Sequence, residues 1–176
     1  VHYGIGMFRL MLSETINLTP LSFLNRSGLH FSQSIGNLAH DHGFDMGDDQ
    51  GSVTNIDSAV LVFNFTEITR ANAIEISGTP GGDGVAAVLD ALAASIVDLS
   101  GNFNQDQLGF PIAETADIIL PELVSATLNF TTGVLTFQAS EILDLTPAST
   151  QTKPYFIEFR QTSASSTVFP AENYDV

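Results

Sequence analysis

Cysteine is absent from this 176-residue chain, and its absence excludes disulfide bonds and thiolate metal sites. Basic residues are scarce, because 5 Lys and Arg stand against 20 Asp and Glu, giving a formal net charge of −15. Nucleic acids and anionic lipid surfaces bind through clusters of Lys and Arg. No apolar run approaches the ~18–20 residues of a membrane-spanning helix, and no basic-then-apolar signal segment opens the chain. The sequence therefore predicts neither a nucleic-acid partner nor membrane insertion.

Hydrophobic residues make up 44 % of the chain, including 13 Phe, so a packed core can form. Apolar and polar residues alternate in residues 128–130 and 135–139, with Thr131-Thr132-Gly133 between them. This pattern predicts a β-hairpin with one buried face and a turn that contains glycine. Residues 59–65 alternate in the same way, with the apolar positions at Ala59, Leu61, Phe63 and Phe65. The sequence predicts an all-β fold.

Two segments have helical character. Residues 66–76 are expected to hold a short turn of helix that begins near Thr66. Residues 85–97 are rich in Ala and Leu, which favours a helix. Their apolar residues are nearly continuous, however, and glycine-containing turns flank them, so two short strands are the favoured interpretation and a helix is the alternative.

An internal repeat links the two ends of the chain. Residues 6–22 read GMFRLMLSETINLTPLS and residues 133–149 read GVLTFQASEILDLTPAS, an offset of 127 with seven of seventeen positions identical. The pairs Ser-Glu and Leu-Thr-Pro recur at the same spacing in both copies. Two unrelated strands would not share these pairs, so we interpret the repeat as a structural unit.

The repeat predicts the domain organisation. Residues 1–120 would form one β-sandwich that lacks its first strand, because nothing in the first copy corresponds to residues 121–127. Residues 121–176 would begin a second repeat, to be completed by another segment or chain. We expect one nearly complete domain plus part of a second.

Residues 125–149 (SATLNFTTGVLTFQASEILDLTPAS) resemble the opening hairpin of tandem Ig-like or cadherin-like repeats of large extracellular surface or fibre-forming proteins. Residues 94–102 are similar to the D-x-x-G-N turn that closes such domains. The resemblance implies Ig-like β-sandwich repeats, an extracellular or cell-surface location, and a role in adhesion, in a surface coat or in a filament. It carries no catalytic or ligand-binding motif.

An acidic segment at residues 40–51 gathers His, Gly and four carboxylates. A solvated loop is the favoured interpretation. The alternative is a Ca²⁺ site, since Ca²⁺ takes six to eight oxygen ligands, and a transition metal is a third option because of the His-x-His pair. The candidate ligands are Asp41, Asp45, Asp48 and Asp49. No other cofactor is expected.

A second polar run contains Asp98, Asn102, Asn104 and Asp106, and we interpret it as a structural turn rather than a Ca²⁺ site. Four N-x-[ST] sequons provide candidate glycosylation sites at Asn17, Asn25, Asn64 and Asn129. In the two strand sequons, at Asn64 and Asn129, the alternation predicts that the Asn points away from the core.

Catalysis is not expected. The sequence contains no G-x-S-x-G, H-E-x-x-H or P-loop motif. Paired carboxylates of a glycosidase type are the remaining enzymatic alternative. The favoured function is a structural one: copies of the chain assemble into a filament or surface fibre by inter-subunit strand complementation. The alternative is a fragment of a multi-repeat adhesin that binds carbohydrate or protein, with or without Ca²⁺.

Overall fold

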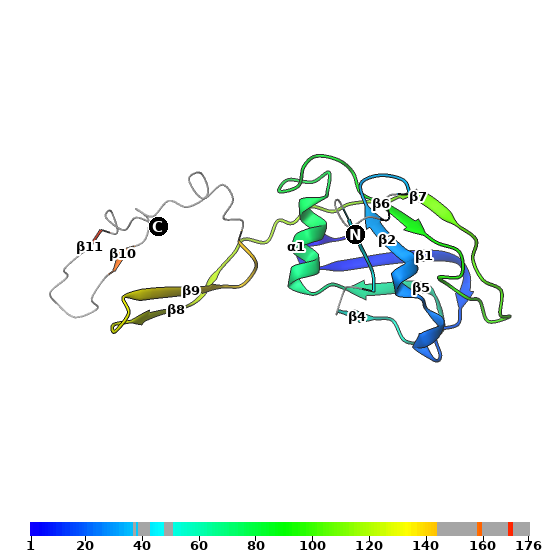
Figure 1. Ribbon diagram of the computed structural model, residues 1–176, viewed down its shortest axis with the longest axis horizontal. Helices are drawn as coiled ribbons and strands as arrows, with labels where there is room; N and C mark the ends of the chain where they lie inside the picture. Colours follow the sequence, from blue (N-terminus) through cyan, green and yellow to red (C-terminus); the bar gives the residue numbers. More distant parts are fainter. Residues whose placement is uncertain (37, 39–42, 48–50, 144–157, 160–168, 171–176) are drawn as a thin grey trace. The chain divides into compact units, whose positions relative to one another are not determined.

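The computed structural model describes residues 1–36, 38, 43–47, 51–143, 158–159 and 169–170 (Figure 1). The regular structure is mostly β-strand arranged in antiparallel sheets, which confirms the all-β prediction. The chain divides into two compact units, Val1–Glu122 with Ser140–Ile142 and Leu123–Ala139 with Leu143–Val176.

The first sheet of the first unit has the strand order β1-β5-β4. Its strands are β1 (Met7–Ile16), β5 (Ser58–Asn64) and β4 (Ser52–Val53). Alternate residues of β1 point inward, so that Phe8 is 3 % exposed while Met11 is 71 % exposed. On β5, Leu61 and Phe63 are fully buried, as the period-2 pattern of this segment predicts.

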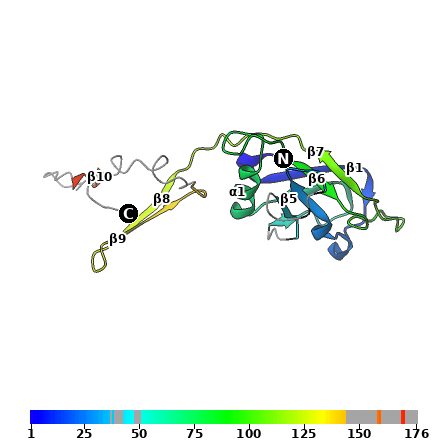
Figure 2. The ribbon, with the colours of Figure 1, turned by 45° about the horizontal axis from the view of Figure 1, so that its top comes forward.

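The second sheet has the order β3-β2-β6-β7, and Figure 2 shows β6 beside β7. Its strands are β3 (Gly43–Asp45), β2 (Leu29–Ser32), β6 (Val88–Ala91) and β7 (Gln107–Pro111). Strand β6 confirms the strand interpretation for the first part of residues 85–97, because it pairs with β2 on one side and β7 on the other. The second expected strand is reduced to a bridge between Val97 and Phe103.

The acidic segment is not wholly a loop, which corrects that part of the prediction. Gly43–Asp45 forms β3 and pairs with β2, with Phe44 opposite Phe31. The two rings stack with their centroids 5.3 Å apart. This aromatic contact stabilises residues 43–45 as a strand, although the surrounding sequence is rich in Asp and Gly.

The two sheets face each other across one hydrophobic core, and phenylalanine rings join them. The ring of Phe8 on β1 contacts Phe31 on β2 edge-on at 6.0 Å and stacks on Phe63 of β5 at 6.0 Å. Burial of each such side chain contributes about 1.5–3 kcal/mol to folding. A chain without disulfides is held together here by core packing.

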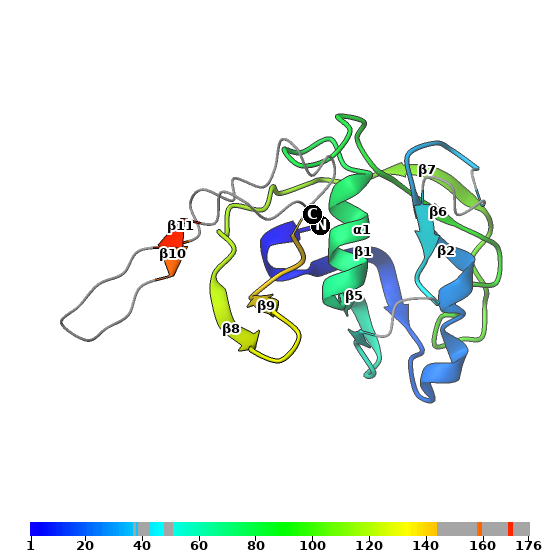
Figure 3. The same ribbon diagram turned by 60° about the vertical axis from the view of Figure 1, so that its left-hand side comes forward.

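Helix α1 (Glu67–Glu75) connects β5 of the first sheet to β6 of the second (Figure 3). It begins where the sequence predicts, because Thr66 is its N-cap and the Thr66 hydroxyl accepts a 3.2 Å hydrogen bond from the backbone N–H of Thr69. The described residues of this unit also form three 3₁₀ turns: η1 (Tyr3–Ile5), η2 (Leu21–Phe23) and η3 (Arg26–Gly28).

The second unit contains the predicted hairpin, formed by β8 (Leu123–Asn129) and β9 (Val134–Ala139). Gly133 closes its turn with φ of +73°, a conformation that glycine adopts without strain. One face pairs Leu128 with Leu135 and Ala126 with Phe137. The predicted burial of this face is wrong for the described residues, where the apolar face is open and Phe137 is 44 % exposed. Strands β10 (Glu158–Phe159) and β11 (Phe169–Pro170) pair with each other.

Candidate functional site at the open edge of strand β1

Strand β1 is an edge strand: among the described strands it pairs with β5 alone. On the other side only its two ends are paired: Met7 and His2 exchange backbone hydrogen bonds of 3.1 and 2.8 Å, and Ile16 forms a bridge with Asp98. Backbone groups of an antiparallel strand alternate in direction. Arg9 and Met11 therefore direct their N–H and C=O groups to the same side as Met7. An unpaired row of this kind is a template for another strand.

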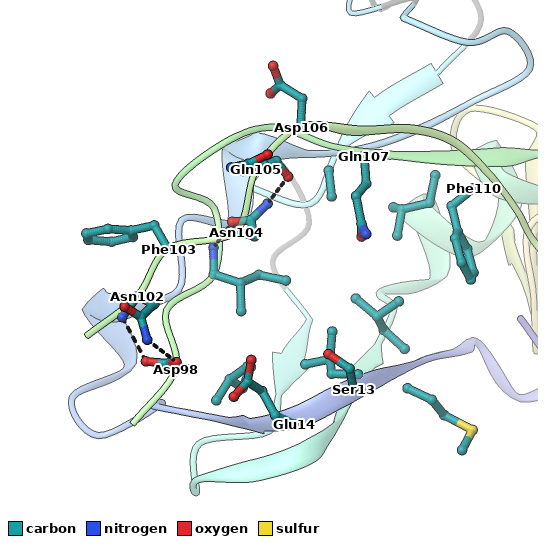
Figure 4. Close-up of a pocket in the computed structure, with 17 residues that line it drawn as sticks. Ser13, Glu14, Asp98, Asn102, Phe103, Asn104, Gln105, Asp106, Gln107 and Phe110 are labelled. Atoms are coloured by element: carbon teal, nitrogen blue, oxygen red, sulfur yellow. Dashed lines mark hydrogen bonds between the residues drawn. The ribbon is translucent and has the colours of Figure 1, made fainter. Parts of the chain in front are cut away.

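A groove of about 540 Å³ runs along this open edge (Figure 4). Strand β1, with Ser13 and Glu14, forms one wall, and the segment from Asp98 to Gln107 forms the other. Apolar side chains from both sheets line the groove: Leu10, Leu12, Ile16, Leu89, Ala91, Ile96 and Phe110. The groove thus combines an apolar lining, a polar rim and a strand edge with unpaired backbone.

Asp98 shapes the far wall by organising a tight turn. Its Oδ1 accepts hydrogen bonds from the backbone N–H groups of Ser100 (2.8 Å) and Asn102 (2.7 Å), and Oδ2 accepts one from the Asn102 side chain (2.7 Å). Gly101 has φ of +87°. The hydrogen bonds from Asn102 lower the pKa of Asp98, because they stabilise its charged form. The polar run forms the predicted structural turn.

Asn104 and Asp106 hold the rest of this wall. The Asn104 amide donates to the carbonyl of Leu92 (2.8 Å), and its Oδ1 accepts from the N–H of Ile96 (2.8 Å). Oδ1 of Asp106 accepts from the N–H of Ala93 at 2.6 Å. These side chains form hydrogen bonds with backbone groups, so the wall keeps its conformation without regular secondary structure.

A buried arginine organises the other end of the first unit. Arg70 of α1 donates two 2.7 Å hydrogen bonds to Glu67 and one of 2.7 Å to Glu141, and it also donates to Asp117. Hydrogen bonding to Glu67 raises the pKa of Arg70, and the same bonds lower the pKa of Glu67. Glu67 also accepts the backbone N–H of Ile142 at 2.8 Å. The cluster fixes residues 140–142 to α1.

The sequence did not identify this cluster or the buried Asp90. Asp90 lies on β6 with no exposed surface, and its carboxylate accepts the N–H groups of Gly36 (2.7 Å) and Gly109 (2.5 Å). The composition contained a hint of the Arg70 cluster. With 5 basic and 20 acidic residues, each basic side chain is expected to have several carboxylates available as partners. Which carboxylates meet it depends on contacts 47 and 71 residues apart.

The predicted metal ligands are placed only in part. Asp45 lies on β3, where its Oδ1 accepts the N–H of Gly47 at 2.7 Å. Asp41, Asp48 and Asp49 lie outside the described residues. Among the residues that the structure does describe, there is no group of three or more His, Asp or Glu arranged to hold a metal ion. Calcium binding by the acidic segment stays a prediction.

The four sequon asparagines lie at or near the surface. Asn25, Asn64 and Asn129 are exposed, and Asn17 is half-buried. The Asn64 amide donates to the Ser52 hydroxyl at 3.0 Å. For Asn64 the outward orientation expected from the alternation is confirmed, because it is exposed next to the buried Phe63. Every residue of β8 is exposed, so the exposure of Asn129 does not distinguish one face of the strand from the other.

Comparison with protein-family models, with curated proteins and with solved structures gives no match for this chain. Within the part of the chain that the structure describes, no helix is long and apolar enough to cross a membrane. The functional inference therefore depends on the groove beside β1 and on the internal repeat.

Proposed function

We propose that this chain is a non-enzymatic structural protein of the cell surface or extracellular space. Its Ig-like β-sandwich repeats assemble into a filament or fibre by adding a strand to the open edge of β1. The observation that carries the proposal is the groove beside β1, where unpaired backbone lies next to an exposed part of the core. Such an edge favours pairing with another strand.

The strand orders support the Ig-like assignment. In Ig-type sandwiches, strands A-B-E-D form one sheet and C-F-G the other, with C′ added beside C in the variable type. The order β1-β5-β4 corresponds to B-E-D, and β3-β2-β6-β7 corresponds to C′-C-F-G. On this assignment none of the described strands of the first unit takes the place of strand A, and the groove lies beside strand B where strand A would pair.

The exposed hairpin β8–β9 supports assembly as well. Every residue of β8 is exposed in the structure, and Phe130 in the adjoining turn is 90 % exposed. An isolated two-stranded hairpin is marginally stable in water, and contiguous exposed apolar surface marks interaction sites. The surface sequons at Asn25, Asn64 and Asn129 agree with an extracellular location.

Sedimentation and electron microscopy of the purified full chain test the proposal, with Met11→Pro as the blocking variant. Proline removes the N–H of residue 11, which points to the open edge and not to β5, so it blocks strand addition at limited cost to the existing sheet. We expect large assemblies for the wild type and loss of them for Met11→Pro. Met11→Thr is the matched control, because it changes the same exposed side chain and keeps the N–H.

A wild-type chain that stays a monodisperse monomer over a wide concentration range would contradict the proposal. Equal loss of assembly in Met11→Thr would also contradict it, since the side chain and not the backbone edge would then be responsible. Thermal melting of each variant shows whether the first unit is still folded.

A second candidate is a multi-repeat adhesin for carbohydrate or protein, and the polar rim of the groove favours it. Gln105 and Gln107 are exposed there, and amide side chains are suited to hydrogen-bond sugar hydroxyls. Melting curves with glycans, with Ca²⁺ and with EDTA distinguish this candidate. A bound ligand raises the midpoint, whereas an unmoved midpoint in EDTA argues against calcium-dependent repeats.

A further inference from the structure

Strands β1 and β9 are equivalent in structure as well as in sequence at their starting points. His2 pairs with Met7, and Asn129 pairs with Val134, each 127 residues further along. The glycine before each strand has positive φ, +61° for Gly6 and +73° for Gly133. The two turns therefore have the same length and lead into strands that begin at matching residues.

Strand β9 pairs with β8 on the side where, among the described residues, Arg9 and Met11 of β1 have no paired strand. Strand β8 pairs with it so that Thr127 lies opposite Thr136, Ala126 opposite Phe137 and Ser125 opposite Gln138. Subtracting 127 from the β9 residues of these pairs gives the equivalent register on β1. In that register Thr127 lies opposite Arg9, Ala126 opposite Leu10 and Ser125 opposite Met11.

The groove fits a strand in this register. Val1 takes the place equivalent to Leu128 and packs against the core, so the part of β1 next to Val1 is already covered. The groove is lined from Leu10 onward. In the shifted register Ala126 lies on the inward face opposite Leu10, where its small side chain points to the apolar lining, and Ser125 lies outward beside Met11.

Release of β8 from its own hairpin costs little. The hairpin has two strands, all residues of β8 are exposed, and isolated hairpins are marginally stable. In the groove the same strand would extend a three-stranded sheet to four strands and would cover apolar side chains of both sheets.

We propose that residues 122–127 of a second copy of this chain occupy the groove by strand exchange. The donor runs antiparallel to β1, with Ala126 opposite Leu10 and Ser125 opposite Met11. This inference rests on the proposed function, because it names the donor and the register of the strand addition.

Cysteine crosslinking tests the register directly, since the native chain has no cysteine. Full chains carrying Met11→Cys and Ser125→Cys are prepared separately, mixed and mildly oxidised, and the crosslinked heterodimer is identified by mass spectrometry. Both positions are exposed, so neither change removes a core contact. The matched control mixes Ser125→Cys with Arg9→Cys, two residues out of register on the same face of β1.

We expect about tenfold more heterodimer from the Met11 pair than from the Arg9 pair. A shift of two residues moves the Cα atoms about 7 Å apart along the strand, beyond the reach of a disulfide. Each single-cysteine chain is first checked for an unchanged thermal midpoint.

The outcomes separate this inference from the proposed function. Assemblies that form without the Ser125–Met11 crosslink, or with equal crosslinking to Arg9, overturn the inference and leave assembly standing. A crosslink that forms only within one chain carrying both substitutions means that the chain fills its own groove, which overturns the second-copy donor. Wild-type chains that remain monomeric overturn both.

Discussion

Nη2 of Arg70 and Oε2 of Glu141 form a 2.7 Å ion pair between residues 71 positions apart. Glu141 belongs to the Ser-Glu pair of the second repeat copy, and its counterpart in the first copy is Glu14. Glu14 is exposed and lines the groove beside β1. The repeated Ser-Glu therefore occupies two environments, one held by a buried arginine and one beside an open strand edge.

Arg70→Ala is expected to lower the free energy of unfolding of the first unit by about 3–5 kcal/mol, because removal of one partner leaves buried charges uncompensated. The Arg70 side chain is 9 % exposed and contacts three carboxylates. Urea denaturation followed by circular dichroism measures the loss. Arg9→Ala is the control: Arg9 is exposed, and a change there is expected within about 0.5 kcal/mol. Equal losses in the two variants would contradict the role assigned to the cluster.

Acid should weaken the same cluster in a defined direction. Hydrogen bonds from Arg70 lower the pKa of Glu67 below its ordinary value of 4.5. The unfolded chain then binds the proton more tightly, so the contribution of Glu67 is complete above pH 4.5 and is lost as the pH falls through the lowered pKa. We expect the difference in urea midpoint between wild type and Glu67→Gln to shrink as the pH falls from 7 to about 3. A difference independent of pH would show that the carboxylate charge is not responsible.

Gly6→Ala is expected to destabilise the first unit by about 1–2 kcal/mol, because the left-handed conformation places a Cβ too close to the backbone. Gly6 has φ of +61°, and a Cβ there would meet the Arg70 side chain at an ordinary 3.5 Å. The cost is therefore conformational and not a clash. Gly6→Asn tests this, since Asn adopts positive φ more readily than Ala. If Gly6→Asn lowers the free energy of unfolding more than Gly6→Ala does, side-chain size and not backbone conformation is the cause.

Asp90→Ala is expected to lower the free energy of unfolding by about 3 kcal/mol. The substitution removes a buried carboxylate that accepts two backbone hydrogen bonds, and both N–H donors are left without their acceptor. Amide exchange at Gly36 and Gly109, the two donors, should accelerate in this variant. Asp90→Asn keeps one acceptor oxygen, so its free energy of unfolding should fall by less than that of Asp90→Ala. Unchanged exchange at both glycines in Asp90→Ala would show that other contacts hold these segments.

Local sequence patterns correctly predicted several of the secondary-structure elements. The hairpin β8–β9 and the buried residues of β5 followed from alternation, which involves residues close in sequence. A short turn of helix was expected near Thr66, and the structure has a nine-residue helix that begins after it. The acidic segment was harder to predict. Gly43–Asp45 is a strand because Phe44 stacks on Phe31, and a distant aromatic partner leaves no mark on local composition.

The sequence by itself determined the all-β class, the repeat at an offset of 127 residues and the outward position of Asn64, because alternation and self-similarity are properties of the order of residues. Only the tertiary structure decided that β1 lies at a sheet edge, that Asp98 braces the wall opposite it and that Arg70 meets three carboxylates. These features arise from strand pairing and packing between distant segments. The stability of these contacts depends on which groups lie close together in the folded chain. Local sequence patterns do not show which distant residues come together.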